Sequence, residues 1–190
     1  MTTLHLVRHG ETEWNRDGRI QGWADTPLSE RGHEQARELA ATLVERPIGA
    51  IYSSDLRRAY ETAEPLAQLL GLKVRTTPAL RERNFGENEG RASDEVAVEL
   101  GTRSGTTWHA ADDRHPGGES IREVYRRVAA FLDELLHAPP AVEIAIVTSG
   151  GPIRFATAYL AREPVETVVW RAVDNCSVTT VEVDPLSLRG

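Results

Sequence analysis

Residues 4–15 read Leu-His-Leu-Val-Arg-His-Gly-Glu-Thr-Glu-Trp-Asn, a mostly apolar run that opens directly into a charged segment with a glycine. The run at 4–7 predicts a buried strand, because short apolar runs are typical of strands covered on both faces. Arg8 and His9 stand where this strand ends. A neutral imidazole can attack phosphorus near pH 7, and a guanidinium can bind two phosphate oxygens at once. His9 is therefore a candidate nucleophile with a permanent cation beside it.

A histidine at a strand end can also serve only to hydrogen-bond the backbone. The neighbours of His9 favour chemistry over that role, because Arg8, Gly10 and Asn15 surround it. Gly10 lets the chain turn sharply beside the ring and leaves a carbonyl to orient its other nitrogen.

The rest of the chain alternates predicted strands with predicted helices. Strands are predicted at 50–53, 73–76, 142–147 and 177–183, and helices at about 29–46, 55–71, 93–100, 120–137 and after 150–152. This pattern indicates an α/β fold whose mainly parallel sheet is covered on both faces. In such a sheet the site lies at the carboxyl ends of the strands, where Arg8-His9 and Ser149-Gly150-Gly151 both fall.

Several single residues predict where these elements begin and end. Ser29 and Asp55 are expected to cap the first two long helices, and Gly71 to end the second. Pro65 inside that second helix predicts a kink. Pro152 is expected at the first position of the last helix. Cys176 is expected to be a small buried residue of the last strand.

Composition limits the class of protein. The 190 residues suffice for one domain, 1–190, and 40% hydrophobic with 27% charged residues is ordinary for a globular chain. One cysteine excludes an internal disulfide and fits a reducing compartment. With no signal peptide and no run long enough to span a bilayer, we expect a cytoplasmic protein with no membrane partner.

The formal net charge of −7 argues against a nucleic-acid partner, and no basic stripe is interleaved with aromatic residues. The same charge repels an anionic substrate from the molecule as a whole. A phosphate site would therefore need a local cluster of arginines. No histidine has metal-ligand spacing with another, so no metal is expected.

Three further clusters contain residues that could take part in catalysis or ligand binding. Residues 52–63 contain Arg57 and Arg58 at a helix start, where arginines are ordinarily solvated. We expect this of Arg57, whereas Arg58, next to small residues, is expected to aim at the sheet end. Residues 80–90 contain Glu82. A single glutamate in a charged loop is ordinarily exposed to solvent, so Glu82 by itself is weak evidence for a catalytic role. Residues 147–154 place Ser149 before two glycines whose N–H groups suit an anion.

Together with residues 8–15 and the Pro-Gly-Gly-Glu-Ser run at 116–120, these clusters resemble the motifs of the histidine phosphatase (phosphoglycerate mutase-like) superfamily, in family order. The resemblance covers nearly the whole chain. It implies a three-layer α/β/α sandwich and a phosphoryl transfer that uses neither metal nor cofactor. The implied ligand is a small phosphorylated metabolite.

The resemblance also implies roles for individual residues. His9 would accept the phosphoryl group, and Glu82 would protonate the leaving oxygen and later activate water. Arg8, Asn15 and Arg58 would bind phosphoryl oxygens. Further site positions are Gln21, Gly22, Ser149, Gly150 and Gly151.

One position departs from the family pattern. The family carries a second histidine where this chain has Ser149, and a hydroxyl lacks the charge that an imidazolium supplies to the transferring group. Two readings follow: a phosphatase of reduced or altered activity, or a phosphate-ester binder or relative recruited to another reaction. Whether Ser149 is natural or engineered is open, as is the oligomeric state, with a homodimer among the options.

The phosphatases of the family resemble this chain more than its mutases do. Mutases carry an inserted segment after the Glu82 motif that is missing here, and Gln21-Gly22 replaces their Thr-Gly. The segment 84–118 is expected to form a lid over the rest of the substrate. Its polar side chains suggest that this part of the substrate carries a polar group, with a second anionic group among the options. These side chains are Asn84, Arg91, Arg103, Trp108, His109 and Arg114. His109 or His115 could also face the substrate.

Overall fold

The computed structural model describes residues 1–101, 110–168 and 171–184. Its centre is a sheet with the strand order β3-β2-β4-β1-β5. Four strands run parallel, and β5 runs antiparallel to β1 at the edge. The strands are Thr2–Arg8 (β1), Ile48–Ser54 (β2), Val74–Thr77 (β3), Glu143–Thr148 (β4) and Val178–Val183 (β5).

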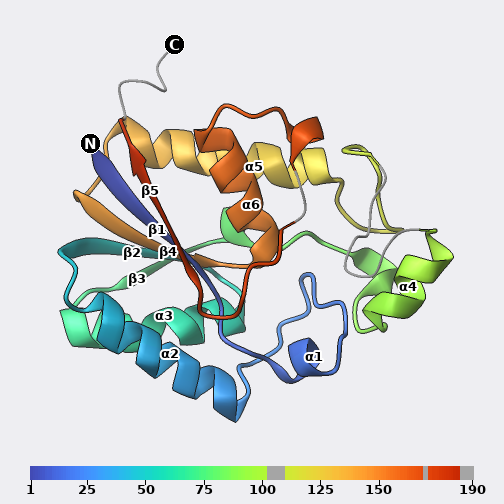
Figure 1. Cartoon of the computed structure of the whole chain (residues 1–190), viewed down its shortest axis with the longest axis horizontal. Helices are drawn as coiled ribbons and strands as arrows, with labels where there is room; N and C mark the ends of the chain where they lie inside the picture. Colours follow the sequence, from blue (N-terminus) through green and yellow to red (C-terminus); the bar gives the residue numbers. More distant parts are fainter. Residues whose placement is uncertain (102–109, 169–170, 185–190) are drawn as a thin grey trace.

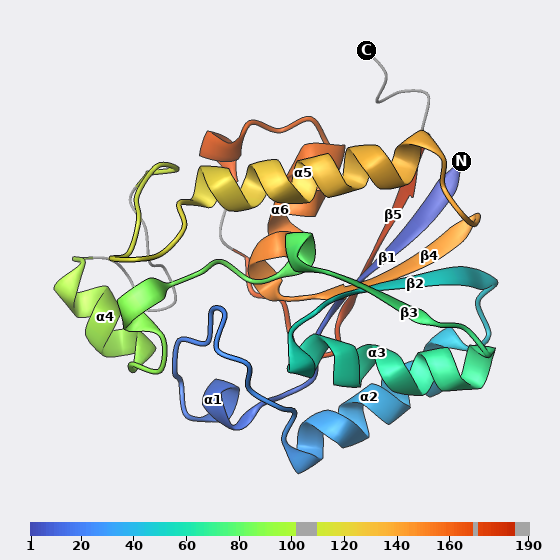
Figure 2. The ribbon, with the colours of Figure 1, turned by 180° about the vertical axis from the view of Figure 1, so that it is seen from behind.

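Helices cover both faces of this sheet. In Figure 1 and, from behind, in Figure 2, α2 and α3 lie on one face and α5 and α6 on the other. Their bounds are Glu30–Leu43 (α2), Arg57–Leu70 (α3), Ile121–His137 (α5) and Gly150–Leu160 (α6). The fold is therefore the three-layer sandwich that the sequence predicts.

Two short helices, α1 (Glu13–Arg16) and α4 (Ser93–Glu99), lie away from these layers, beyond the carboxyl ends of β1 and β4 (Figure 1). Single turns of 3₁₀-helix follow β3, precede α4 and follow α6, at Pro78–Leu80, Gly86–Asn88 and Val165–Thr167. Within the described ranges, no helix is both long and apolar enough to cross a membrane.

The central strands β1, β2 and β4 are largely buried because each face of the sheet packs against a helical layer. Successive side chains of a strand point to opposite faces. Leu4 and Leu6 of β1 accordingly pack in the core beneath α5 and α6, while Val7 packs with α2 and α3. In β4, Ile146 and Val147 divide between the two cores in the same way.

The helix ends confirm some predictions and correct others. Ser29 caps α2, and Gly71 ends α3 with a left-handed φ of 66°. Asp55 does not cap α3. Its carboxylate forms two hydrogen bonds with the guanidinium of Arg81 (2.8 and 2.6 Å), and the helix begins two residues later. Pro152 is the third residue of α6, where a missing N–H also costs no intrahelical bond.

Cys176 also differs from its prediction. It lies before β5 rather than in it, is only half-buried, and has a φ of 55°. Its N–H donates to the carbonyl of Arg8 (3.0 Å), so the turn that contains it closes against the end of β1. Its half-buried side chain packs against the core that also contacts α2 and α3.

Candidate active site

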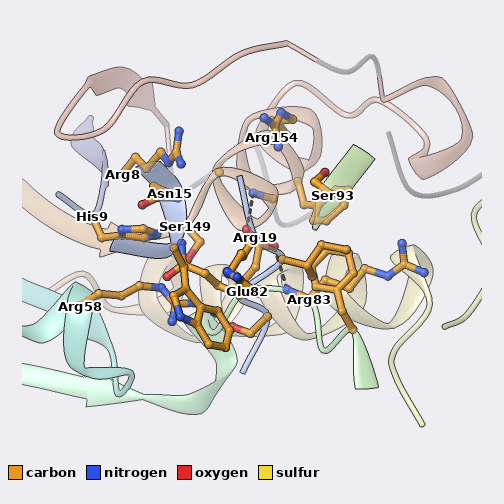
Figure 3. A pocket seen from close by; sticks show the side chains of 18 of the residues that line it. Arg8, His9, Asn15, Arg19, Arg58, Glu82, Arg83, Ser93, Ser149 and Arg154 are labelled. Atoms are coloured by element: carbon orange, nitrogen blue, oxygen red, sulfur yellow. Dashed lines mark hydrogen bonds between the residues drawn. The ribbon is translucent and has the colours of Figure 1, made fainter. Parts of the chain in front are cut away.

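A cavity of about 300 Å³ opens at the carboxyl ends of β1 and β4. Figure 3 shows its side chains converging from β1, α3, α6 and the segment after β3. The structure brings all ten sequence-predicted site residues to its wall: Arg8, His9, Asn15, Gln21, Gly22, Arg58, Glu82, Ser149, Gly150 and Gly151.

His9 is held in one orientation and one tautomer. Its backbone N–H donates to the carbonyl of Thr148 (2.8 Å), and its Nδ1 lies 2.7 Å from the carbonyl of Gly10. Because a carbonyl only accepts, Nδ1 carries the proton and Nε2 keeps its lone pair. The ring points toward Ser149 across the cavity (Figure 3).

Burial, followed by the charges of Arg58 and Arg8, holds the pKa of His9 well below its ordinary value. The imidazole is therefore neutral at pH 7. A neutral ring with a free Nε2 is the form of histidine that can act as a nucleophile.

Arg58 is fixed beneath the cavity as the sequence predicts. Its side chain is buried, and its two Nη atoms donate to the carbonyls of Gly22 (2.7 Å) and Ala24 (2.8 Å). Burial lowers its pKa to about 10, so it remains charged at pH 7. Arg57 instead pairs with Glu61 on the surface. The carbonyl bonds hold the cation of Arg58 in place without neutralising it.

Arg8 ends β1, and its Nη1 donates to the carbonyl of Val173. Burial lowers its pKa too, while the carboxylates of Glu82 and Asp174 oppose that effect. Arg8 and Arg58 thus place two guanidinium groups on either side of His9 (Figure 3).

The side-chain amide oxygens of Asn15 and Gln21 accept hydrogen bonds from other groups of the protein. Asn15 Oδ1 accepts from the N–H of Thr12 (3.2 Å) and from Nδ2 of Asn175 (3.3 Å). Gln21 Oε1 accepts from the hydroxyls of Thr12 (2.9 Å) and Thr26 (2.6 Å). The amide nitrogens of Asn15 and Gln21 are thereby left as donors for a ligand. The sequence did not indicate Asn175, whose Nδ2 also lies 2.9 Å from the carbonyl of His9.

Glu82 is positioned by its own loop and by α6. Its Oε1 accepts from the N–H of Arg83 (2.8 Å), and its Oε2 from that of Gly151 (3.1 Å). Its carbonyl accepts from Trp23 and Arg127, each at 2.8 Å. A Cβ at position 151 would lie 2.2 Å from Oε1, so this approach requires a glycine.

Ser149 sits between β4 and α6 and is buried. It is the N-cap residue of α6, yet its hydroxyl makes no capping hydrogen bond to the helix. Figure 3 places its side chain between His9 and Glu82. Ser149 therefore faces the cavity.

Sequence reasoning missed several lining residues. Five arginines line the cavity with Glu82 as the one carboxylate among the described lining residues, although the chain is acidic overall. Arg154 could have been found, because it lies one helical turn after Gly150 and so shares its face of α6. The other missed residues are Trp14, Gly18, Arg19, Ile20, Arg83, Phe85, Ser93, Ile121, Phe155 and Val168.

Among the described residues of the segment 84–118, Phe85 and Ser93 line the cavity, whereas Asn84, Arg91 and Arg114 do not. Arg91 and Arg114 are engaged in ion pairs with Glu99 and Glu123. The amide oxygen of Asn84 accepts from the N–H of Gly86 (2.7 Å) and stabilises the local turn. His115 is buried with its Nδ1 2.7 Å from Asn88 Nδ2, and is not part of the cavity wall. Arg103, Trp108 and His109 lie outside the described residues.

No group of three or more histidine, cysteine or acidic side chains converges within the described ranges as a metal ligand set would. The cationic groups that face the cavity are guanidinium groups.

Fold and site together define an α/β sandwich with a basic cavity around one neutral histidine at the end of its sheet. The model of the histidine phosphatase superfamily (branch 1) matches residues 4–188. The chain belongs to this superfamily.

Relatives within the family carry two kinds of name. The chain is 36% identical over 183 residues to "Probable phosphoglycerate mutase GpmB" of Cronobacter sakazakii, covering 96% of this chain and 85% of that protein. It matches a mycobacterial glucosyl-3-phosphoglycerate phosphatase, solved with VO3, with a TM-score of 0.88 and 33% identity over 96% and 93% of the two chains. It matches the α-ribazole phosphatase of Shigella flexneri with a TM-score of 0.84 and 30% identity over 96% and 91%.

Proposed function

We propose that this protein is a metal-independent phosphatase that hydrolyses a small phosphate monoester through a phosphohistidine on His9. The observation that carries the proposal is the neutral His9, whose free Nε2 lies between Arg8 and Arg58 and across the cavity from Glu82. Phosphoryl transfer requires little from a protein besides positioning and charge neutralisation, and this cavity supplies both.

In the first step, Nε2 of His9 attacks phosphorus and the bond between phosphorus and the ester oxygen breaks. Glu82 in its protonated form gives its proton to the departing alkoxide. In the second step, the Glu82 carboxylate takes a proton from water as that water attacks phosphorus. The N–P bond breaks, and inorganic phosphate leaves. Arg8, Arg58 and Asn15 hold the phosphoryl oxygens throughout, and the hydroxyl of Ser149 donates a hydrogen bond to them.

A mutase would differ by returning the phosphoryl group from His9 to another hydroxyl of the substrate. The solved neighbours named as phosphatases favour hydrolysis. The described chain also passes from Glu82 to α4 at Ser93 through one short turn, with no inserted segment between them. We therefore place phosphatase ahead of phosphoglycerate mutase, the activity in the names of relatives such as that of Cronobacter sakazakii.

Phosphate release is expected to continue undiminished in excess EDTA, because Arg8 and Arg58 supply the charge that a metal ion supplies in metal-dependent phosphatases. The measurement is release of inorganic phosphate from a panel of phosphorylated metabolites, with and without chelator. Activity that disappears with EDTA and returns with Mg²⁺ or Zn²⁺ would contradict the proposed chemistry. A phosphorylated isomer as the product, in place of free phosphate, would indicate a mutase.

Ser149 favours a second candidate, a protein that binds phosphate esters or carries out another, non-hydrolytic reaction. Loss of one group aimed at developing charge typically lowers a rate by about 10²–10³-fold. A reduction of that size slows an enzyme without abolishing it, and every other predicted site residue lines the cavity. We therefore place the phosphatase first.

Ser149→His is expected to raise kcat by at least about ten-fold, or about 1.4 kcal/mol in the barrier. The imidazolium would restore charge next to the phosphoryl group, at a position that faces the cavity. The matched control is Ser149→Gln, which adds comparable bulk and hydrogen-bonding groups without charge and should give no gain. Loss of ligand binding with no gain of hydrolysis in Ser149→His would instead support the non-hydrolytic candidate.

A further inference from the structure

Arg127 does not line the cavity, but it contacts the main chain of the segment that carries Glu82. Its helix, α5, packs against the 3₁₀ turn Pro78–Leu80, as Figure 2 shows. From α5, Nη1 of Arg127 donates to the carbonyls of Ala79 (2.8 Å) and Arg81 (2.7 Å), and Nη2 donates to that of Glu82 (2.8 Å). One guanidinium therefore binds three carbonyls between positions 79 and 82.

The remaining donors of Arg127 bind Glu119. Nε donates to Glu119 Oε1 and Nη2 to Oε2, each at 3.0 Å, and Oε2 also accepts from the N–H of Asn84 (2.9 Å). A guanidinium has five N–H donors in a fixed fork, and all five of Arg127 are engaged in these contacts. An ion pair with Glu119 alone would use two of them. The other three donate to the main chain around Glu82, which indicates that Arg127 fixes the course of that chain.

The peptide group between Glu82 and Arg83 connects Arg127 to the carboxylate of Glu82. Its carbonyl accepts from Arg127 and from Nε1 of Trp23, each at 2.8 Å. Its N–H donates to Glu82 Oε1 (2.8 Å). Because a peptide group is planar, fixing the direction of its carbonyl also fixes the direction of its N–H. The bonds that hold this carbonyl therefore orient the carboxylate, whose Oε2 accepts from the N–H of Gly151 (3.1 Å).

We propose that Arg127 is a positioning residue for Glu82. By holding the peptide groups on both sides of Glu82, it keeps that carboxyl group where it can protonate the leaving oxygen. The proposal rests on the proposed function, because it takes Glu82 as the general acid. A misplacement of about 1 Å, caused by a change far from the chemistry, can lower a rate by about 10²-fold. Since Arg127 does not line the cavity, its loss should leave phosphate binding by Arg8 and Arg58 unchanged.

Arg127→Met removes all five donors and keeps an unbranched side chain. Its kcat/KM for ethyl phosphate is expected to fall by on the order of 30-fold, whereas that for 4-nitrophenyl phosphate, whose leaving group needs little protonation, should fall by less than about three-fold. Affinity for inorganic phosphate, measured by calorimetry, should be unchanged. Arg127→Lys, which keeps the charge and three donors, should restore part of the rate. Arg126→Met is the matched control, because it removes an exposed cation from the same helix and should behave as the wild type.

A double-mutant cycle decides whether Arg127 acts through Glu82. A positioning residue has little left to do once the group that it positions has been changed. On ethyl phosphate, Glu82→Gln/Arg127→Met should therefore be within about two-fold of Glu82→Gln alone. Losses that multiply in the double variant, or equal losses on both esters in Arg127→Met, would overturn the proposal. If Arg127→Met does not remain folded, Arg127→Lys is measured in the same cycle, with the same pattern expected at smaller size.

Amide hydrogen exchange separates this proposal from the proposed function, because it needs no turnover. The N–H groups of Arg83 and Gly151 donate to the Glu82 carboxylate, and Ile146 in buried β4 serves as the reference. Arg127→Met should speed exchange at Arg83 and Gly151 by on the order of ten-fold relative to Ile146, since local opening exposes amides without global unfolding.

Unchanged exchange at Arg83 and Gly151, or an equal increase at Ile146, would contradict the positioning role of Arg127. If no ester is hydrolysed but exchange at Arg83 and Gly151 still depends on Arg127, the proposed phosphatase activity fails and the positioning of the Glu82 carboxyl group by Arg127 stands.

Discussion

Replacing His9 with alanine is expected to lower kcat for phosphate-ester hydrolysis by about 10⁴–10⁶-fold, as removal of a nucleophile does in other enzymes. No other described side chain of the cavity wall is a histidine, cysteine or lysine that could take over the attack. The measurement is steady-state phosphate release from phenyl phosphate by purified variants. Because Arg8 and Arg58 remain, His9→Ala should still bind inorganic phosphate, as calorimetry would show.

His33→Ala is the matched control, because it removes an exposed imidazole of α2 that does not line the cavity. Its rate should stay within about two-fold of the wild type, since surface changes have small effects. Turnover that survives His9→Ala undiminished, in a protein that remains folded, would remove His9 from the mechanism.

Glu82→Gln is expected to slow the hydrolysis of alkyl phosphates by about 10²–10⁴-fold, the usual contribution of general acid–base catalysis. Their leaving alkoxides need the proton that Gln cannot give. For 4-nitrophenyl phosphate, whose leaving group is stable as an anion, the loss in the first step should be much smaller. The amide can still accept from the N–H of Gly151, so the loop keeps its contact with α6.

The measurement is kcat/KM across esters of increasing leaving-group basicity, with Glu87→Gln as an exposed control in the same segment. The variant should give a steeper dependence on leaving-group basicity than the wild type. An equal loss for every ester would reduce Glu82 to a positioning residue.

The fold could be predicted because the central strands each contain a short apolar run and the helices between them have one apolar face. Leu6 and Val7, adjacent in the sequence, pack into different cores, which only a sheet covered on both faces allows. The site followed from this topology, since His9 and Ser149 end neighbouring parallel strands, β1 and β4. Residues at the carboxyl ends of neighbouring parallel strands lie close together, so their meeting can be predicted from the strand order alone.

Contacts that depend on tertiary packing could not be predicted. Aspartate is a common N-cap residue, yet the carboxylate of Asp55 accepts hydrogen bonds from the guanidinium of Arg81, which is distant in the sequence. The position of Cys176 depends on a turn that closes against Arg8. Asn175 has no signature in the sequence, and its role becomes visible only through its bonds to His9 and Asn15.

The lid prediction illustrates the same limit. A charged segment before α5 suggested polar contacts to substrate, but Arg91 and Arg114 form ion pairs with neighbouring glutamates. The additional guanidinium groups on the cavity wall belong to Arg19, Arg83 and Arg154, and its apolar side chains include Phe85 and Phe155. The negative net charge of the sequence indicated that an anion site would need a cluster of arginines, but it did not indicate which arginines would be buried there.

The central claim, a phosphohistidine on His9, is tested most directly by trapping it. The wild-type chain is mixed with a phosphate ester labelled in its phosphoryl group, quenched rapidly in base, and digested for mass spectrometry. The account predicts a phosphoryl adduct on His9 that is stable in base and labile in acid, forms as fast as the alcohol is released, and is absent from His9→Ala. Turnover with no adduct at any quench time, or an adduct on another residue, would contradict it.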